Sequence, residues 1–236
     1  MTVSIHQPCY WPWLGHFDRV RLSDLHIILD HVHITHGGKT QFANRNKIRT
    51  AQGWSWLTVP ILTKGKGEDL GIDRIQIADG HWRRKHHAAI NQSYGKSRFY
   101  RDFAAGLSAL FAREWPTLCE LCIETNAFLA QPLGIHTPMK RSSELGVPGS
   151  KEALVLNLCR EVGATRYLSG PFGRDYLDLP AFAEAGIEVA FHDYDHPRYT
   201  QAYPGFEPYM STLDLVLNHG AESRLILANE ERAPLT

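Results

Sequence analysis

The first thirty residues alternate between short apolar runs and an amphipathic stretch. Residues 3–5 predict a short strand, which stops where Pro8 moves Gln7 out of helical geometry. Residues 11–23 carry apolar side chains at helical spacing, and residues 25–29 form a mostly apolar run typical of a strand buried on both faces. Strand, helix and strand in this order predict a parallel α/β unit.

The middle of the chain changes character. Residues 30–50 are polar and predict a loop, while 54–62 and 72–77 read as strands that could pair in an antiparallel insertion. Helical spacing predicts helices over 81–94, 99–115 and 117–129, the last two closed by Pro116 and Pro132. Residues 134–149 are rich in turn formers.

The alternation of helix and strand returns in the second half. Helices are predicted over 151–162 and 179–185, and strands over 166–169 and 187–191. The chain contains no internal repeat and no low-complexity linker. We therefore predict an α/β fold with a mostly parallel sheet in three layers, as one domain spanning 1–236 with a helical insertion at about 81–130.

Composition excludes several classes of protein. Twenty-five basic residues balance 25 acidic ones, and 43% of the residues are hydrophobic, so we expect a folded protein and no nucleic-acid partner. No stretch approaches the ~20 apolar residues of a membrane span, and the amino terminus does not resemble a secretory signal. The four cysteines are few, so a cytoplasmic location is expected. Histidine, with 13 copies, is the unusual residue.

Chemically useful side chains follow the first strand, at His6, Gln7, Tyr10 and Trp13. Ligands of open α/β sheets bind beyond the carboxyl ends of the strands, so His6 is a candidate general base and Gln7 and Tyr10 are candidate substrate contacts. The alternative is a packed strand end. Cys9 lies beside His6 and is a conceivable thiolate nucleophile, although a buried thiol is the more common state of cysteine.

A second candidate group follows the second strand. Asp30 could orient His6 and fix its tautomer, as in an acid/base dyad, or it could be a capping carboxylate. If that strand continues, His31 and His33 lie on one side of it and offer two zinc ligands. A third and fourth ligand are missing, so no metal is predicted.

The third group is Arg45, Asn46 and Lys47, whose amide and cationic side chains suit a phosphate or a carboxylate. A solvated loop is the alternative.

Two further groups follow strands in the second half. Ser169 enters a glycine-bearing turn that could present backbone amides to an anion, or be a tight turn only. His196 and Tyr199 follow the last strand, and such imidazole and aromatic groups suit a sugar-binding or acid/base site. Cys119 and Cys122 lie on one helical face without a second pair, as buried apolar residues do.

At these residues the sequence resembles the WbqC-like proteins of bacteria, in matches that run in order from residue 5 to about 220. The matching positions are His6, Gln7, Pro8, Tyr10, Pro12, Trp13, Leu14, Gly15, Phe17, Asp18, Asp30, Arg45, Asn46, Lys47, Ile48, Trp56, Leu57, Thr58, Val59, Pro60, Tyr167, Leu168, Ser169, Gly170, Tyr176, Leu177, His196, Pro197, Tyr199, Gln201, Phe206, Ser211, Asp214, Leu215 and Gly220. The chain departs from the usual family pattern at Cys9, His31 and His33.

The resemblance implies a role in surface-polysaccharide biosynthesis, with transfer of a glycyl or other acyl group to an amino sugar. On this hypothesis His6 is the base, Asp30 orients it, the Arg45 loop holds an anionic group, and His196 with Tyr199 contacts the sugar. The substrate would be a small molecule or sugar nucleotide. No cofactor is required, and coenzyme A or the phosphopantetheine of an acyl carrier protein could supply the acyl thioester. The alternatives are a nucleotidyltransferase and a non-catalytic glycan-binding module.

Overall fold

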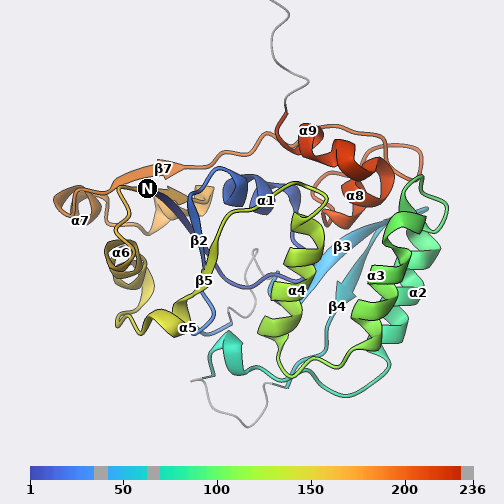
Figure 1. Ribbon diagram of the computed structural model, residues 1–236, viewed down its shortest axis with the longest axis horizontal. Helices are drawn as coiled ribbons and strands as arrows, with labels where there is room; N and C mark the ends of the chain where they lie inside the picture. The colour runs from blue at the N-terminus through green and yellow to red at the C-terminus, as the bar shows by residue number, and fades with distance from the viewer. Residues whose placement is uncertain (35–41, 63–69, 230–236) are drawn as a thin grey trace, which may run out of the picture.

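A five-stranded, fully parallel sheet organises one half of the protein (Figure 1). The structure is a computed structural model that describes residues 1–34, 42–62 and 70–229. The sheet order is β5-β2-β1-β6-β7. Its strands are β1 (Thr2–His6), β2 (Leu25–Ile28), β5 (Met139–Arg141), β6 (Arg166–Ser169) and β7 (Glu188–Phe191). The predicted α/β class and parallel sheet are confirmed.

The strand order changes direction between β1 and β6. Chain order runs outward from β1 through β2 to β5 on one side, and from β6 to β7 on the other. Val3 of β1 pairs with Leu25 of β2 and with Tyr167 of β6, so His6 and Ser169 end neighbouring strands at the same edge. Open α/β sheets bind ligands at such a switch point, which makes this edge the first place to look for a site.

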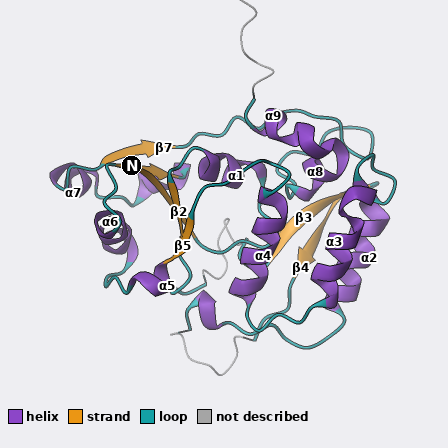
Figure 2. Ribbon diagram, in the orientation of Figure 1, coloured by secondary structure: helices purple, strands orange, loops and turns teal. Residues whose placement is uncertain are grey.

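Helices cover both faces of the sheet (Figures 1 and 2). One face packs on α6 (Lys151–Glu161) and α7 (Leu179–Glu184), where Leu158 and Phe182 join Val3 and Ile5 in one apolar cluster. The other face carries α1 (Leu14–Arg21), whose Phe17 belongs to a larger core. That core also draws on α8 (Leu213–His219) and α9 (Ser223–Leu227).

The chain between β2 and β5 builds a second body of structure. It holds a hairpin of β3 (Arg45–Thr50) and β4 (Gly53–Thr58), the turn η1 (Ile72–Arg74), and the helices α2 (Trp82–Tyr94), α3 (Tyr100–Ala112) and α4 (Leu118–Ala130). The three helices lie where the apolar spacing predicts them. Their apolar core is continuous with the cluster around α1. The insertion therefore shares a hydrophobic core with the helix that packs on the sheet.

Three expectations are corrected here. Residues 45–50 form β3 rather than a loop. The apolar pattern does not predict this strand, because one of its alternating buried positions is polar Asn46, while Ile48 is apolar. The partner of β4 is β3, and residues 72–77 contribute a turn and an isolated bridge between Ile61 and Ile77. The turn-rich stretch contains β5 and the short helix α5 (Ser142–Leu145), since an edge strand of three residues has no apolar pattern to reveal it.

The short turns η2 (Pro171–Asp175) and η3 (Gly220–Glu222) complete the described elements. Among the described residues, no helix has the length and apolar character needed to cross a bilayer.

Candidate functional site

The loop that joins β1 to α1 is fixed from three directions. Asn46 donates to the carbonyl of Trp11 at 2.6 Å, Asn126 donates to the carbonyl of Cys9 at 2.8 Å, and the Tyr10 hydroxyl meets His86 Nδ1 at 2.9 Å. Trp11 is fully buried at a φ of 46°, in the left-handed region that costs a bulky side chain energy. The loop is therefore held in a conformation that its own sequence does not favour.

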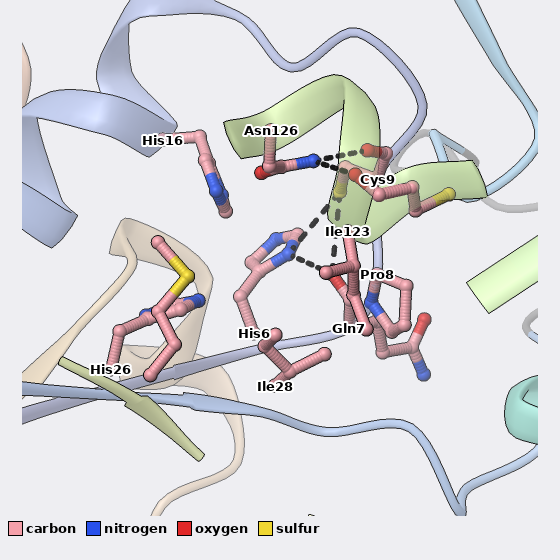
Figure 3. Close-up of a pocket in the computed structure, with 11 residues that line it drawn as sticks. His6, Gln7, Pro8, Cys9, His16, His26, Ile28, Ile123 and Asn126 are labelled. Atoms are coloured by element: carbon pink, nitrogen blue, oxygen red, sulfur yellow. Dashed lines mark hydrogen bonds between the residues drawn. The ribbon is translucent and has the colours of Figure 1, made fainter. Parts of the chain in front are cut away.

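His6 stands at the start of this loop with a defined orientation (Figure 3). Its Nδ1 lies 2.7 Å from the carbonyl oxygen of Gln7 and 3.3 Å from the sulfur of Cys9. A carbonyl oxygen only accepts hydrogen bonds, so Nδ1 carries the proton and Nε2 keeps its lone pair. Nε2 makes no hydrogen bond with any described residue, and it is thus free to accept a proton from a ligand.

Two more imidazoles surround His6. The ring of His16, in the first turn of α1, lies 5.4 Å from the rings of both His6 and His26. His26 Nδ1 meets the hydroxyl of Ser4 at 2.9 Å. His16 is buried, and neither of its nitrogens makes a hydrogen bond within the described chain, although the Asn126 amide is near enough to act on its pKa.

Arg19 lies one turn further along α1 and is also buried. Its Nε and Nη2 atoms have no hydrogen-bond partner in the part of the chain that the structure describes. Its charge acts on His6, Cys9, His16 and His26. The positive charge of Arg19 is therefore close enough to affect the pKa values of all three imidazoles.

This environment holds the cluster in its uncharged form. Burial first, and then the charge of Arg19, lowers the pKa of His6 to about 3. The pKa values of His16 and His26 are also lowered by burial, with nearby cationic and imidazole groups adding to the effect. Burial raises the pKa of the Cys9 thiol to about 12, against the opposing pull of Arg19. At neutral pH these groups are three neutral imidazoles and a thiol.

A narrow cavity opens among these side chains. Its volume is about 10 Å³, and His6, Gln7, Cys9, His16 and His26 are among the residues that line it. Side chains of α4 and β5 complete the lining. His6, Cys9 and His16 also place one ligand atom each within 4.8 Å of one another, a donor set that zinc accepts.

Asp30 is not a partner of His6. Its fully buried carboxylate accepts from Arg141 Nε at 2.6 Å, from the Ser142 hydroxyl at 3.0 Å, and from the backbone and hydroxyl of Ser143 at 2.9 and 2.8 Å. Asp30 follows the end of β2, and its partners lie at the end of β5 and the start of α5, so these hydrogen bonds connect the three elements. The tautomer of His6 is instead set by the Gln7 carbonyl.

The histidines after β2 do not line one strand face. His31 Nδ1 meets the Ser142 hydroxyl at 2.6 Å, and His33 forms an isolated bridge with Gly71. Cys119 and Cys122 are fully buried, as expected for apolar packing.

The predicted anion-binding group of β3 is already engaged. Asn46 is buried and holds the carbonyl of Trp11. The guanidinium of Arg45 lies 4.6 Å from the ring centre of Trp56, and the ammonium of Lys47 lies 4.9 Å from that of Trp54. These contacts make the outer side of the hairpin an aromatic and cationic surface.

This surface connects to His6 through rings. The ring centre of Trp13 lies 5.6 Å from that of His6 and 5.1 Å from that of Phe42. The ring centre of Phe42 lies 6.4 Å from that of Trp56, a residue that is 37% exposed. We call Trp13, Phe42 and Trp56 the aromatic strip. It leads from the cavity to the surface of the protein.

His196 and Tyr199 belong to a separate cluster. Both nitrogens of His196 are occupied, Nδ1 with the carbonyl of Pro197 at 2.8 Å and Nε2 with the backbone N–H of Tyr209 at 3.2 Å. The ring of Tyr199 stacks on His196 and meets Phe206 edge to face. The cavity beside His6 is lined by neither residue, nor by Asp30 or Arg45, so the predicted convergence of these groups in one cavity is not seen among the described residues.

The remaining predicted contacts are close to the switch point. Gln7 lines the cavity and donates to the carbonyl of His33 at 3.3 Å. Tyr10 is fully buried against His86, so it shapes the loop. The Ser169 hydroxyl donates to the Gly170 carbonyl at 3.1 Å, at the end of β6.

Sequence reasoning missed Arg19 and His26 as part of the candidate site. A signal was present, because His16 and Arg19 are spaced i, i+3 and so share one helical face with each other. His26 interrupts an otherwise apolar run. Polar residues at positions that the pattern assigns to the core are the trace of this site in the sequence.

Comparison with known proteins adds an evolutionary relationship. The pattern of the "WbqC-like protein family" matches residues 7–226. Among curated proteins, the "uncharacterized protein Rv1507c" of Mycobacterium tuberculosis is 37% identical over 228 residues, which cover 94% of this chain and 95% of that protein. No solved structure gives a significant match.

Proposed function

This chain belongs to the WbqC-like protein family, and from that premise we propose that it transfers an acyl or aminoacyl group to the amine of an amino sugar or a similar small molecule. The observation that carries the proposal is the neutral imidazole of His6, held at the switch point of the sheet with Nε2 unengaged. Amine acylation needs a base at this kind of position, because the attacking nitrogen must lose a proton.

The proposed reaction uses few groups. The amine attacks the thioester carbonyl, His6 Nε2 takes the proton from nitrogen, and the tetrahedral intermediate collapses with rupture of the C–S bond. The leaving thiolate recovers the proton and departs as a thiol. The donor would be a coenzyme A or carrier-protein thioester.

The aromatic strip supports an amphipathic acceptor. A sugar ring has an apolar face that packs well on an aromatic side chain, and Trp56 offers such a face at the surface. In this proposal the acceptor lies along Trp13 and Phe42 with its amine toward His6.

The test measures amine-dependent release of free thiol from an acyl thioester, with an amino sugar as acceptor. His6→Ala should lower the rate by at least about a hundredfold. His33→Ala is the matched control, since it removes an exposed imidazole from the adjacent loop. Thiol release at the wild-type rate in His6→Ala would remove His6 from the mechanism.

A second candidate is nucleotidyl transfer, favoured by a different observation. The strand order and its switch point are typical of nucleotide-binding sheets, and Gly15 and His16 lie in the first turn of the helix after β1. That activity would release pyrophosphate in the presence of magnesium rather than a thiol. A glycan-binding module would bind the sugar and release neither product.

A further inference from the structure

Arg19 is a buried cation whose guanidinium is incompletely engaged by the described residues. Only 6% of the residue is exposed, and its Nε and Nη2 atoms have no hydrogen-bond partner within the described ranges 1–34, 42–62 and 70–229. Buried charges are normally paired, because the loss of hydration is costly. Its isolation indicates that the partner is a ligand.

The groups around Arg19 supply no negative charge. Its charge acts on the three imidazoles, on Cys9, and on the hydroxyls of Tyr167 and Tyr176. Burial keeps the Cys9 thiol and the Tyr167 phenol protonated by raising their pKa values. These described neighbours therefore leave the positive charge of Arg19 unbalanced.

The position of Arg19 relates this charge to the switch point. Side chains of a helix lean toward its amino terminus, so Arg19 covers the turn that contains Gly15 and His16. A Cβ at Gly170 would lie 2.6 Å from Nη1, which places the guanidinium against the turn that follows β6. At the same edge, the N-cap residue Trp13 supplies no side-chain acceptor to the first turn of α1.

We propose that Arg19, together with the imidazole of His16, binds the anionic group of the substrate, a phosphate or a carboxylate. The inference deepens the proposed function, and rests on it for the identity of the reaction but not for the existence of the site. A guanidinium can hold either anion through two parallel hydrogen bonds. The neutral imidazole of His16, whose two nitrogens have no hydrogen-bond partner among the described residues, adds a donor on its protonated nitrogen.

Anion binding would also change His6. After burial, the positive charge of Arg19 is the second cause of its lowered pKa, which is about 3. An anion that neutralises Arg19 removes that contribution. Substrate binding thereby makes His6 more basic at the moment when a base is needed.

A metal ion is the competing occupant of the same cluster. The donors His6, Cys9 and His16 suit zinc. A dication would, however, add to the unbalanced charge of Arg19, whereas an anion neutralises it. The electrostatics of the site thus favour the anion.

Equilibrium binding tests the proposal without turnover. Phosphate, pyrophosphate, acetate and Zn²⁺ are each titrated into the full chain while the melting temperature is followed. At a hundredfold excess over Kd, a bound anion should raise it by about 5–10 °C. A response to phosphate and pyrophosphate identifies a phosphorylated substrate, and a response to acetate identifies a carboxylate. Stabilisation by Zn²⁺ with no anion response overturns the proposal.

Arg19→Met separates a binding role from a packing role. The variant should weaken anion binding at least about tenfold, and it should melt at a higher temperature than the wild type without ligand because an unpaired buried charge is gone. Arg21→Met is the control, since Arg21 is exposed and pairs with Asp18 at 2.7 Å; it should leave anion binding unchanged.

Arg19→Lys covers the case in which Arg19→Met fails to fold. It keeps the charge but loses the planar pair of donors, so anion affinity should fall while the fold is retained. Anion affinity unchanged in either folded variant overturns the proposal. Anion binding without thiol release would refute the proposed reaction but leave this site standing.

Discussion

Acid should unfold this protein unusually early, because three buried imidazoles and one half-buried imidazole are held in neutral form. His6, His16 and His26 lie at the site, and the pKa of His86 is lowered by burial to about 4. In the unfolded chain each has a pKa near 6.5. Their contribution to stability is complete above pH 6.5 and is lost as the pH falls toward their folded pKa values.

The size of the effect follows from proton linkage. Each histidine that binds a proton only in the unfolded state costs about 2 kcal/mol at pH 5, so His6 and His86 together cost about 4 kcal/mol, and His16 and His26 act in the same direction. Asp214 acts in the opposite sense, because burial raises its pKa to about 6 and the folded protein takes up its proton first; this returns about 1 kcal/mol at pH 5. The net loss is a large fraction of the stability of a typical domain.

Urea denaturation followed by circular dichroism between pH 7.5 and 5 measures this directly. The free energy of unfolding should fall by at least about 3 kcal/mol over that range. His86→Gln should reduce this loss by about 2 kcal/mol, since glutamine can still hydrogen-bond the Tyr10 hydroxyl but does not titrate. His33→Ala should leave the slope unchanged, because that side chain is exposed. A loss below about 2 kcal/mol between pH 7.5 and 5 would show that these imidazoles are hydrated or already charged.

Three other substitutions have distinct expected outcomes. Asp30→Ala should lower the free energy of unfolding by about 3–5 kcal/mol, or the melting temperature by about 10 °C. It should leave turnover per folded molecule intact, because the partners of Asp30 are Arg141 and Ser143. A hundredfold loss of turnover in thermally stable protein would restore Asp30 as a partner of His6. Cys9→Ser should retain activity in the thiol-release assay, since its thiol is held protonated, whereas complete inactivity would indicate a covalent route. Trp56→Ala should raise the Michaelis constant for the acceptor without lowering the melting temperature, and an unchanged constant would place the acceptor elsewhere.

The sequence predicts the fold well where the apolar pattern is strong. The β1-α1-β2 unit and the helices α2 to α4 follow from spacing alone, since each buries a regular set of apolar side chains. The hairpin strand β3 and the edge strand β5 escape prediction because polar residues fill their buried positions or because the strand is too short. Long-range partners, such as the pairing of β3 with β4, are decided by packing across the fold.

The site is predicted in part, for a related reason. His6 and Gln7 are found because a strand end is a known location for ligands. Asp30 also ends up beside a strand end, but its partners Ser142 and Ser143 lie in a helix that the sequence does not predict. Arg19 is overlooked because a cation in an amphipathic helix is normally assigned to the solvent side.

The distribution of unpaired polar groups argues that this edge is a ligand site rather than an ordinary piece of core. Of the ten buried side-chain atoms without a hydrogen-bond partner among the described residues, five belong to Trp11, His16 and Arg19. Chance would not place half of them within nine residues, next to a tryptophan in left-handed geometry. Polar groups with a purely structural role, such as Asn46 and Asp30, are fully engaged instead. Strain and unmet hydrogen bonds persist in folded proteins where function requires them. The rest of the fold therefore stabilises a set of donors, acceptors and charge that the proposed substrate would engage.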